Sequence, residues 1–121
     1  MTSAPAARSK GTALPALKES DITTQIKGFL ESRGWYAIRL QSGTVRGVTG
    51  GTFMRLGKRG LPDWCFLRGR EALMVEMKRP GGKLSADQQK WFTWAEIQGI
   101  MALHADGLGA FMAKYGRLYT R

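Results

Sequence analysis

The chain has little of several residue types that define other classes of protein. It contains one cysteine, Cys65, and one histidine, His104, among its 121 residues. A single cysteine excludes an internal disulfide, and the pair does not supply the four Cys or His ligands that are typical of a structural zinc site. Because Cys65 lies within an apolar run, we expect it to be a buried, unreactive thiol.

Long apolar runs are missing as well. No stretch approaches the roughly 20 apolar residues that a membrane-spanning helix needs, and no apolar core followed by a cleavage site is found near Met1. We therefore expect a soluble protein of the cytoplasm that contacts no membrane. A length of 121 residues with a hydrophobic fraction of 43% suits one domain around a single core.

Acidic residues are scarce relative to basic ones. Nineteen Lys and Arg oppose nine Asp and Glu, which gives a formal net charge of +10. Such an excess favours a polyanionic partner, most commonly nucleic acid, although a basic protein that is only soluble also fits. Residues 1–14 include Arg8 and Lys10 and show no apolar periodicity, so they are predicted to form a flexible basic tail. Residues 15–121 then form the single domain.

Apolar spacing and turn residues predict an α/β fold. The expected order is helix, strand, hairpin, two strands, helix, strand, helix. A helix that connects two strands makes a crossover, so the sheet should be mixed and flanked by helices. The expected elements are a helix entering at Ile22 with a cap near Ser20, strand Trp35–Gln41, hairpin Val45–Thr49 and Thr52–Leu56, two strands between Trp64 and Lys78, a helix from Ser85 to Gly99, a buried strand Ile100–Leu103 and a last helix ending at Gly116.

The region from Gly60 to Gln88 carries the candidate chemistry. The segment Arg68-Gly69-Arg70-Glu71 suits a tight reversal, which would bring Asp63 beside Glu76 across a hairpin. Side chains alternate along a strand, so Glu76 and Lys78 share one face. Two close carboxylates repel each other unless a cation lies between them, and hard cations such as Mg²⁺ supply that charge.

Each of these residues also has a purely structural interpretation. Ser85 and Gln88 fit a helix-capping box, in which each side chain satisfies a backbone N–H of the first turn. Glu19 and Asp21 both suit the positive end of the first helix. Glu76 and Lys78 could form a solvated ion pair worth about 0–1 kcal/mol, although such a pair fits poorly with so apolar a strand.

Three segments, taken in order, resemble the VRR-NUC (virus-type replication-repair nuclease) family of the PD-(D/E)XK superfamily. The resemblance extends from Glu19 to about His104. Pro-Asp followed by Glu-x-Lys arises easily by chance, whereas the full ordered series is far more specific. The chain departs from the family pattern at Leu61, where Thr is frequent. The segments are Gly60-Leu61-Pro62-Asp63, Glu76-Met77-Lys78 and Lys83-Leu84-Ser85-Ala86-Asp87-Gln88.

The resemblance implies roles for individual residues. Asp63, Glu76 and the Met77 carbonyl would hold Mg²⁺ or Mn²⁺, and a first-helix acid, Glu19 in preference to Asp21, would complete the site. Lys78 would orient the nucleophile or stabilise the transition state, and Gln88 would lie near the same cluster. The basic residues of the glycine-rich segment and of the following loop are expected to contact DNA. They are Arg46, Arg55, Lys58, Arg59, Arg79 and Lys83.

The expected function is metal-dependent hydrolysis of DNA by an endonuclease with a PD-(D/E)XK-like core. Stand-alone relatives of this kind are typical of phages, which implies action in the host cytoplasm. The resemblance of these relatives to archaeal junction resolvases implies a homodimer that acts on branched DNA such as four-way junctions. The alternatives are a non-catalytic DNA-binding module and a flap- or end-directed nuclease. A site-specific restriction-type enzyme would need more chain for base reading. The dimer was expected to bury an exposed apolar patch on the last two helices, made of Trp91, Phe92, Trp94, Leu108, Phe111, Met112 and Tyr115.

Overall fold

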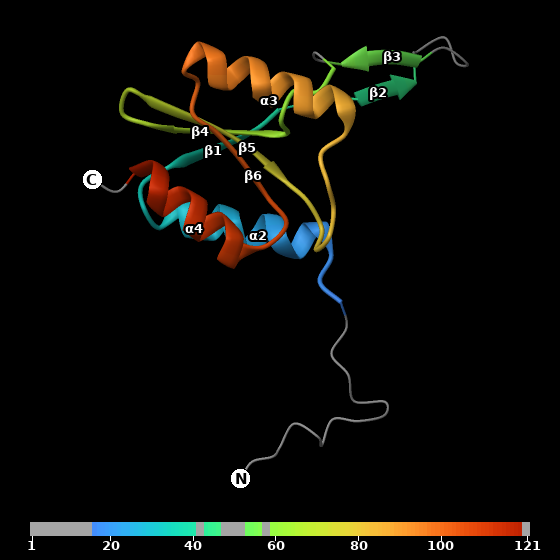
Figure 1. The fold of residues 1–121 in the computed structure, drawn as a ribbon. Helices are drawn as coiled ribbons and strands as arrows, with labels where there is room; N and C mark the ends of the chain where they lie inside the picture. The colour runs from blue at the N-terminus through green and yellow to red at the C-terminus, as the bar shows by residue number, and fades with distance from the viewer. Residues whose placement is uncertain (1–15, 41–42, 47–52, 57–58, 120–121) are drawn as a thin grey trace, which may run out of the picture.

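The computed structural model of the protein describes residues 16–40, 43–46, 53–56 and 59–119. The predicted basic tail over residues 1–14 lies outside these ranges. The described elements follow the predicted order of helices and strands (Figure 1). They are α2 (Glu19–Glu31), β1 (Tyr36–Arg39), β2 (Gly43–Arg46), β3 (Phe53–Leu56), β4 (Trp64–Arg68), β5 (Glu71–Met77), α3 (Ala86–Gln98), β6 (Ala102–Ala105) and α4 (Leu108–Tyr119).

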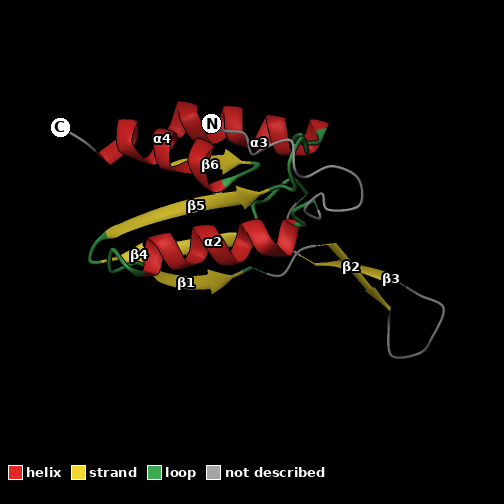
Figure 2. Ribbon diagram, turned by 90° about the horizontal axis from the view of Figure 1, so that it is seen from below, coloured by secondary structure: helices red, strands yellow, loops and turns green. Residues whose placement is uncertain are grey.

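The main sheet has four strands in the order β1-β4-β5-β6. The pairs β1–β4 and β4–β5 are antiparallel, whereas β5 and β6 are parallel. The parallel pair is connected through α3, which confirms the predicted crossover and the mixed sheet. Strands β2 and β3 pair antiparallel as a separate two-stranded sheet, which lies beyond the C-terminal end of β1 in Figure 2.

The core lies between the sheet and the two helices α2 and α4, which cover the same face (Figure 1). Ile22, Ile26 and Leu30 recur every four residues along α2 and are fully buried. They pack with Phe66, Leu73 and Val75 of the sheet and with Phe111 of α4. Fully burying one such side chain contributes about 1.5–3 kcal/mol, so this single face supplies most of the hydrophobic stabilisation.

One buried hydrogen bond ties the two ends of the core together. The Trp35 indole N–H donates to the Tyr115 hydroxyl at 3.0 Å, across a separation of 80 residues. Both side chains are buried. A buried indole N–H without a partner is unfavourable, so this bond fixes how α4 docks beside the start of β1.

Several predicted boundaries were wrong. The first helix begins at Glu19 with Lys18 in the cap position, not near Ser20, because the Asp21 carboxylate accepts the Lys18 backbone N–H at 2.8 Å. The first strand is shorter than predicted and comprises Tyr36–Arg39. The last helix continues through Gly116 to Tyr119. Leu118 and Tyr119 pack against the core, which offsets the roughly 1 kcal/mol that a glycine costs inside a helix.

The strand expected at Ile100–Leu103 lies two residues later, at Ala102–Ala105. Its register is set by the parallel pairing with β5, in which Met74 faces Ala102 and Met77 faces Ala105. Ile100 and Met101 precede the strand and are exposed. The continuous apolar run therefore located the strand approximately but not its first residue.

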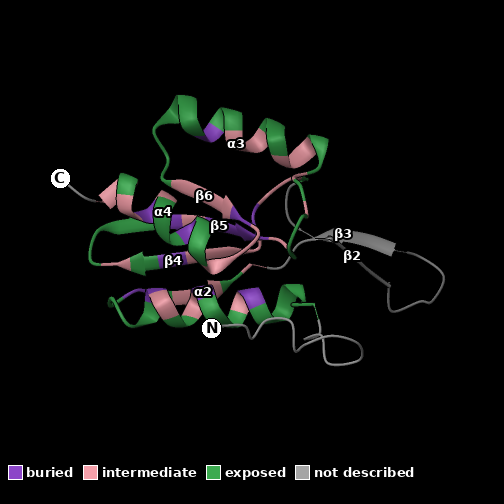
Figure 3. Cartoon of the chain, turned by 60° about the horizontal axis from the view of Figure 1, so that its bottom comes forward, coloured by how far each residue is buried: buried purple, intermediate pink, exposed green. Residues whose placement is uncertain are grey.

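The apolar faces of the last two helices also differ from expectation. Phe111 and Tyr115 are core residues, so they belong to no exposed patch. Helix α3 lies on the opposite face of the sheet, and Ala95 is its one buried residue (Figure 3). The seven residues expected to form one exposed surface are thus divided between two sides of the sheet, and Trp94 and Met112 are the exposed large members.

We predict that Tyr115→Phe lowers the free energy of unfolding by about 1–3 kcal/mol, because it leaves the buried Trp35 N–H without its acceptor. Tyr36→Phe is the matched control, since Tyr36 is 70% exposed, and it should change stability by less than about 0.5 kcal/mol. Urea unfolding of both variants measures the difference. Equal midpoints would show that the Trp35–Tyr115 bond contributes nothing net.

Candidate active site

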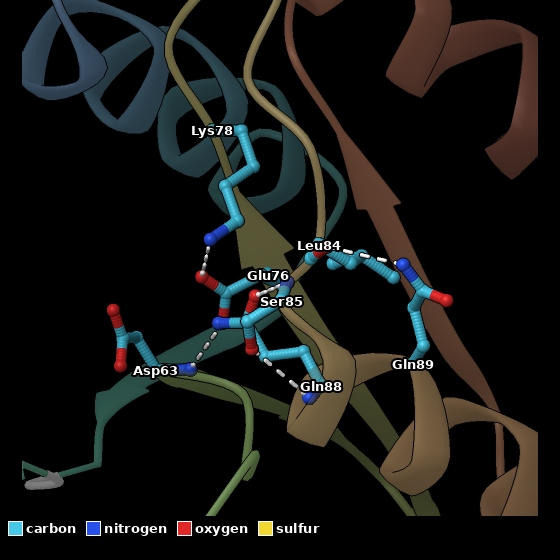
Figure 4. A network of polar contacts seen from close by, with 7 residues as sticks. All are labelled: Asp63, Glu76, Lys78, Leu84, Ser85, Gln88 and Gln89. Carbon is cyan, nitrogen blue, oxygen red and sulfur yellow. Dashed lines mark hydrogen bonds and ion pairs between the residues drawn. The ribbon is translucent and has the colours of Figure 1, made fainter.

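The β4–β5 hairpin brings Asp63 and Glu76 together, as predicted. Trp64 pairs with Val75 in the register, so Asp63 and Glu76 occupy the next position at the open end of the hairpin. The Asp63 backbone N–H donates to Glu76 Oε1 at 3.2 Å (Figure 4). The polypeptide therefore holds the two acidic residues adjacent through a main-chain contact.

Glu76 is a buried acid. It is 3% exposed, and it sits on an interior strand of the sheet. Lys78 Nζ lies 3.5 Å from Glu76 Oε2, so each carboxylate oxygen faces one donor (Figure 4). Burial raises the pKa of Glu76 and the negative charge of Asp63 raises it further, while Lys78 and the Asp63 N–H offset part of this.

The site extends to both faces of β5. Glu76 pairs with His104, which lines a cavity together with Phe92 of α3, so Glu76 and Lys78 lie on the α3 side of the sheet. Met77 points to the α2 side. There it lines a pocket of about 340 Å³ with Asp63 and with residues from the start of α2. Asp63, at the end of the hairpin, connects the two faces.

The α2 side of the site includes Glu19. Glu19 lines the same pocket as Asp63 and Met77. The Asp21 carboxylate, in contrast, accepts the Lys18 backbone N–H and caps the helix. This difference supports Glu19 over Asp21 as the acid of the first helix.

These groups suit a hard cation that retains much of its water. Within residues 16–40, 43–46, 53–56 and 59–119, no three His, Cys, Asp or Glu side chains are grouped as a metal-binding cluster. Mg²⁺ is commonly bound through one or two carboxylates, with water and substrate phosphates as the other ligands. Two adjacent carboxylates, the Met77 carbonyl and Glu19 at the pocket wall fit that pattern. They do not fit a dry, all-protein cage.

The start of α3 is fixed against the loop that leads to Asp63. Ser85 Oγ accepts the Gln88 backbone N–H at 3.1 Å, and Gln88 Oε1 accepts the Ser85 backbone N–H at 2.9 Å, so the predicted capping box is present. Gly60 packs against this turn with a φ of +84°, and a Cβ there would lie 2.3 Å from the Asp87 carbonyl oxygen. Glycine is therefore required both for the backbone conformation and for the close approach.

Residues 52–107 match the family model of the VRR-NUC domain. The chain contains a VRR-NUC domain. No curated protein and no solved structure matched the chain. The matched segment includes Asp63, Glu76, Lys78 and Gln88, and it ends before α4. A VRR-NUC domain is a nuclease domain that acts on DNA, and the mixed sheet with flanking helices is the architecture expected of a PD-(D/E)XK-like nuclease core.

The predicted DNA contacts of the VRR-NUC domain are only partly described. Arg79 and Lys83 are exposed on the loop between β5 and α3, and Arg59 is exposed beside the start of α3. Arg46 and Arg55 lie on β2 and β3, and Lys58 lies outside the described residues. Among these residues, the side chains of Arg59, Arg79 and Lys83 are the ones shown to be exposed. None of the helices among the described residues is long and apolar enough to cross a bilayer.

Sequence reasoning missed one cation of the site. Arg39 lines the pocket that holds Asp63 and Glu19, and its guanidinium lies 5.7 Å from the centroid of the Trp64 ring. It reaches this position because β1 pairs with β4 so that Arg39 faces Trp64. The strand itself was predicted, but only the pairing register reveals that its last residue adjoins Asp63.

We predict that Glu76→Gln raises the melting temperature by a few degrees at pH 7–8 in EDTA, because it removes a charge that burial disfavours. Since the folded-state pKa is raised, ionised Glu76 opposes folding above that pKa. The advantage of the variant should therefore shrink as the pH falls toward about 4, where Glu76 is protonated in both states.

Glu96→Gln, at an exposed carboxylate on α3, is the control and should change the melting temperature little. Differential scanning calorimetry across pH measures both effects. A Glu76→Gln protein less stable than the parent at pH 8 would mean that the Lys78 and Asp63 contacts outweigh the cost of burial.

Proposed function

We propose that this protein is a metal-dependent DNA endonuclease whose catalytic residues are Asp63, Glu76, Lys78 and Gln88. The proposal rests mainly on one observation. A buried carboxylate, Glu76, is held between the Asp63 N–H at 3.2 Å and the Lys78 ammonium at 3.5 Å, at the end of a hairpin within a nuclease domain. A fold gains no stability by burying such a charge, which supports a functional reason for keeping it.

Asp63, Glu76, the Met77 carbonyl and Glu19 would hold Mg²⁺ or Mn²⁺. When bound, the ion activates water and neutralises negative charge on the phosphate. Lys78 is already directed at the carboxylate oxygen of Glu76, so its ammonium lies within reach of a phosphate brought to that carboxylate. There it orients the nucleophile or stabilises the extra charge of the transition state.

Gln88 contributes through the end of α3 that faces this site. Its side-chain carbonyl oxygen is occupied by the Ser85 N–H, which leaves the amide group to donate toward the phosphate or its water. The capping box holds the side chain in one orientation. The structural and the catalytic interpretations of Gln88 are therefore compatible.

Branched DNA, such as four-way junctions, is the proposed substrate, and the net charge of +10 suits the closely spaced phosphates of a branch point. A homodimer would offer one site to each of two equivalent strands. The apolar residues of the last two helices lie on two different faces of the sheet and do not form one dimer interface. The proposal of a dimer is therefore argued only from the symmetry of the substrate. The proposed place of action is the cytoplasm, which is the host cytoplasm if the protein is encoded by a phage.

Cleavage of linear, flap and four-way junction DNA by the purified protein, with Mg²⁺, with Mn²⁺ and with EDTA, tests the function. Metal-dependent nicking that is fastest on the junction supports the proposal. Faster cutting of flaps or ends would favour the flap- or end-directed alternative. Binding without cleavage under all metal conditions would identify a non-catalytic DNA-binding module.

We predict that Asp63→Asn, Glu76→Gln and Lys78→Ala each lower the cleavage rate by more than about 100-fold, because each group acts directly on the metal or on the developing charge. DNA binding should change little, since it depends mainly on the basic surface. Arg70→Ala, in the exposed turn at the far end of the hairpin, is the control. Cleavage by Glu76→Gln at near the parental rate would reject the assigned site.

A further prediction separates the two acids of α2. Glu19→Gln should increase the Mg²⁺ concentration required for half-maximal cleavage by about 10-fold or more, as expected for loss of a group that supports metal binding. Asp21→Asn should leave this concentration nearly unchanged. It should only weaken the helix cap, which lowers the free energy of unfolding by about 1 kcal/mol. Metal titrations of the cleavage rate distinguish them, and the reverse pattern would assign the role to Asp21.

A further inference from the structure

An aromatic pocket lies on α3 next to the loop that carries Asp63. Its volume is about 520 Å³. Trp91 and Trp94 form its aromatic wall, with ring centroids 6.3 Å apart and planes inclined by 53°. The remaining lining residues are Arg59, Leu61, Asp87 and Lys90.

Trp91 and Trp94 are not part of the hydrophobic core. Helix α3 adjoins β6, and Ala95 is its one buried residue. Trp94 remains 50% exposed, so a large apolar ring faces solvent. Folding alone does not account for a tryptophan here, and an exposed aromatic beside a binding site usually marks a contact surface.

The charges around the pocket complement a nucleic acid. Arg59 and Lys90 are exposed cations at its rim. The Arg59–Asp87 ion pair, at 3.4 Å between two exposed side chains, is worth about 0–1 kcal/mol, so the guanidinium can exchange Asp87 for a phosphate at little cost. Aromatic faces combined with cations are the pattern by which proteins bind single-stranded DNA, with the bases stacked on the rings and the phosphates on Lys and Arg.

The pocket adjoins the loop that carries Asp63 of the proposed catalytic site. Leu61 lines it and lies two residues before Asp63. Gly60 fixes this loop to α3 through its close approach to the Asp87 carbonyl. A DNA strand whose phosphate lies at Asp63 and Glu76 therefore passes the tryptophans with its neighbouring nucleotides.

We propose that the Trp91–Trp94 pocket binds unpaired bases of the DNA strand that is cut. The inference rests on the proposed nuclease function and specifies its substrate class, DNA with unpaired bases beside the scissile phosphate. In a continuous duplex the bases are already stacked, and extruding one costs a few kcal/mol. Flaps and gaps offer unpaired bases without that cost, and base pairs at a branch point lack a continuous stack on one side, so they open at a lower cost than pairs inside a duplex. The pocket therefore discriminates in favour of these substrates over continuous duplex DNA.

Binding of a fluorescein-labelled ten-nucleotide oligo(dT) to the full chain in EDTA tests the inference, because it needs no cleavage. Trp94→Ala should weaken binding by about 10-fold or more, the loss of one stacked base, whereas Trp94→Phe should retain most of the affinity. Ile97→Ala, at a 75% exposed position on the same helix but outside this pocket, is the matched control and should bind like the parent protein. Oligo(dT) should also quench the intrinsic tryptophan fluorescence of the parent protein.

Two DNA probes separate stacking from charge. A ten-nucleotide oligomer with abasic sites keeps the phosphates and removes the bases, so the parent protein and Trp94→Ala should bind it equally. A fully paired duplex should likewise show no difference between them. Circular dichroism and urea unfolding of the variants establish that each remains folded.

Equal affinity of the parent protein and Trp94→Ala for oligo(dT) would overturn the inference. So would a Trp94→Ala protein that binds oligo(dT) normally but sediments as a monomer where the parent sediments as a dimer, because the pocket would then be a contact between two copies. These outcomes are independent of cleavage. If the parent protein cut no DNA under any metal condition while the Trp94 effect persisted, the nuclease assignment would fail and the base-binding pocket would stand.

Discussion

The burial of the Glu76 carboxyl group in the interior strand β5 constrains the surrounding structure. Its carboxylate is almost entirely removed from water, and burial raises its pKa. The fold compensates with donors on each side, a backbone N–H from Asp63 and the Lys78 ammonium. Because one donor belongs to the main chain, the position of the Gly60–Asp63 loop is coupled to the charge state of the site. The glycine contact with α3 holds that loop in place.

The two faces of the sheet differ in how many apolar side chains they bury. The face under α2 and α4 contains nearly all of the buried apolar side chains and a hydrogen bond between distant parts of the chain. The other face carries α3, which buries little and presents aromatic and basic side chains beside the active site. Stability is therefore concentrated on one side, and the opposite side is available for recognition. This division lets recognition residues vary without disturbing the core.

Local patterns in the sequence predicted much of this arrangement. The turn at Gly69, the alternation that pairs Glu76 with Lys78 and the Ser85–Gln88 cap depend on residues close in the chain, and all three are present. Features that depend on tertiary pairing were missed or misplaced. Arg39 enters the site only through the register with Trp64, and Phe111 and Tyr115 are core residues only because α4 docks on α2. The start of β6 likewise follows from its parallel pairing with β5, which periodicity cannot supply.

The docking of α4 on α2 also affects the order in which the candidate site is assembled during synthesis of the chain. Every proposed catalytic residue precedes Gln89, whereas α4 comprises residues Leu108–Tyr119. While α4 is still inside the ribosome, Phe111 and Tyr115 are absent from the core and the Trp35 N–H lacks its acceptor. A nascent chain thus has the reactive side chains without the packed layer that positions them. Since domains generally fold as units, we expect the candidate site to be assembled only after α4 has emerged from the ribosome.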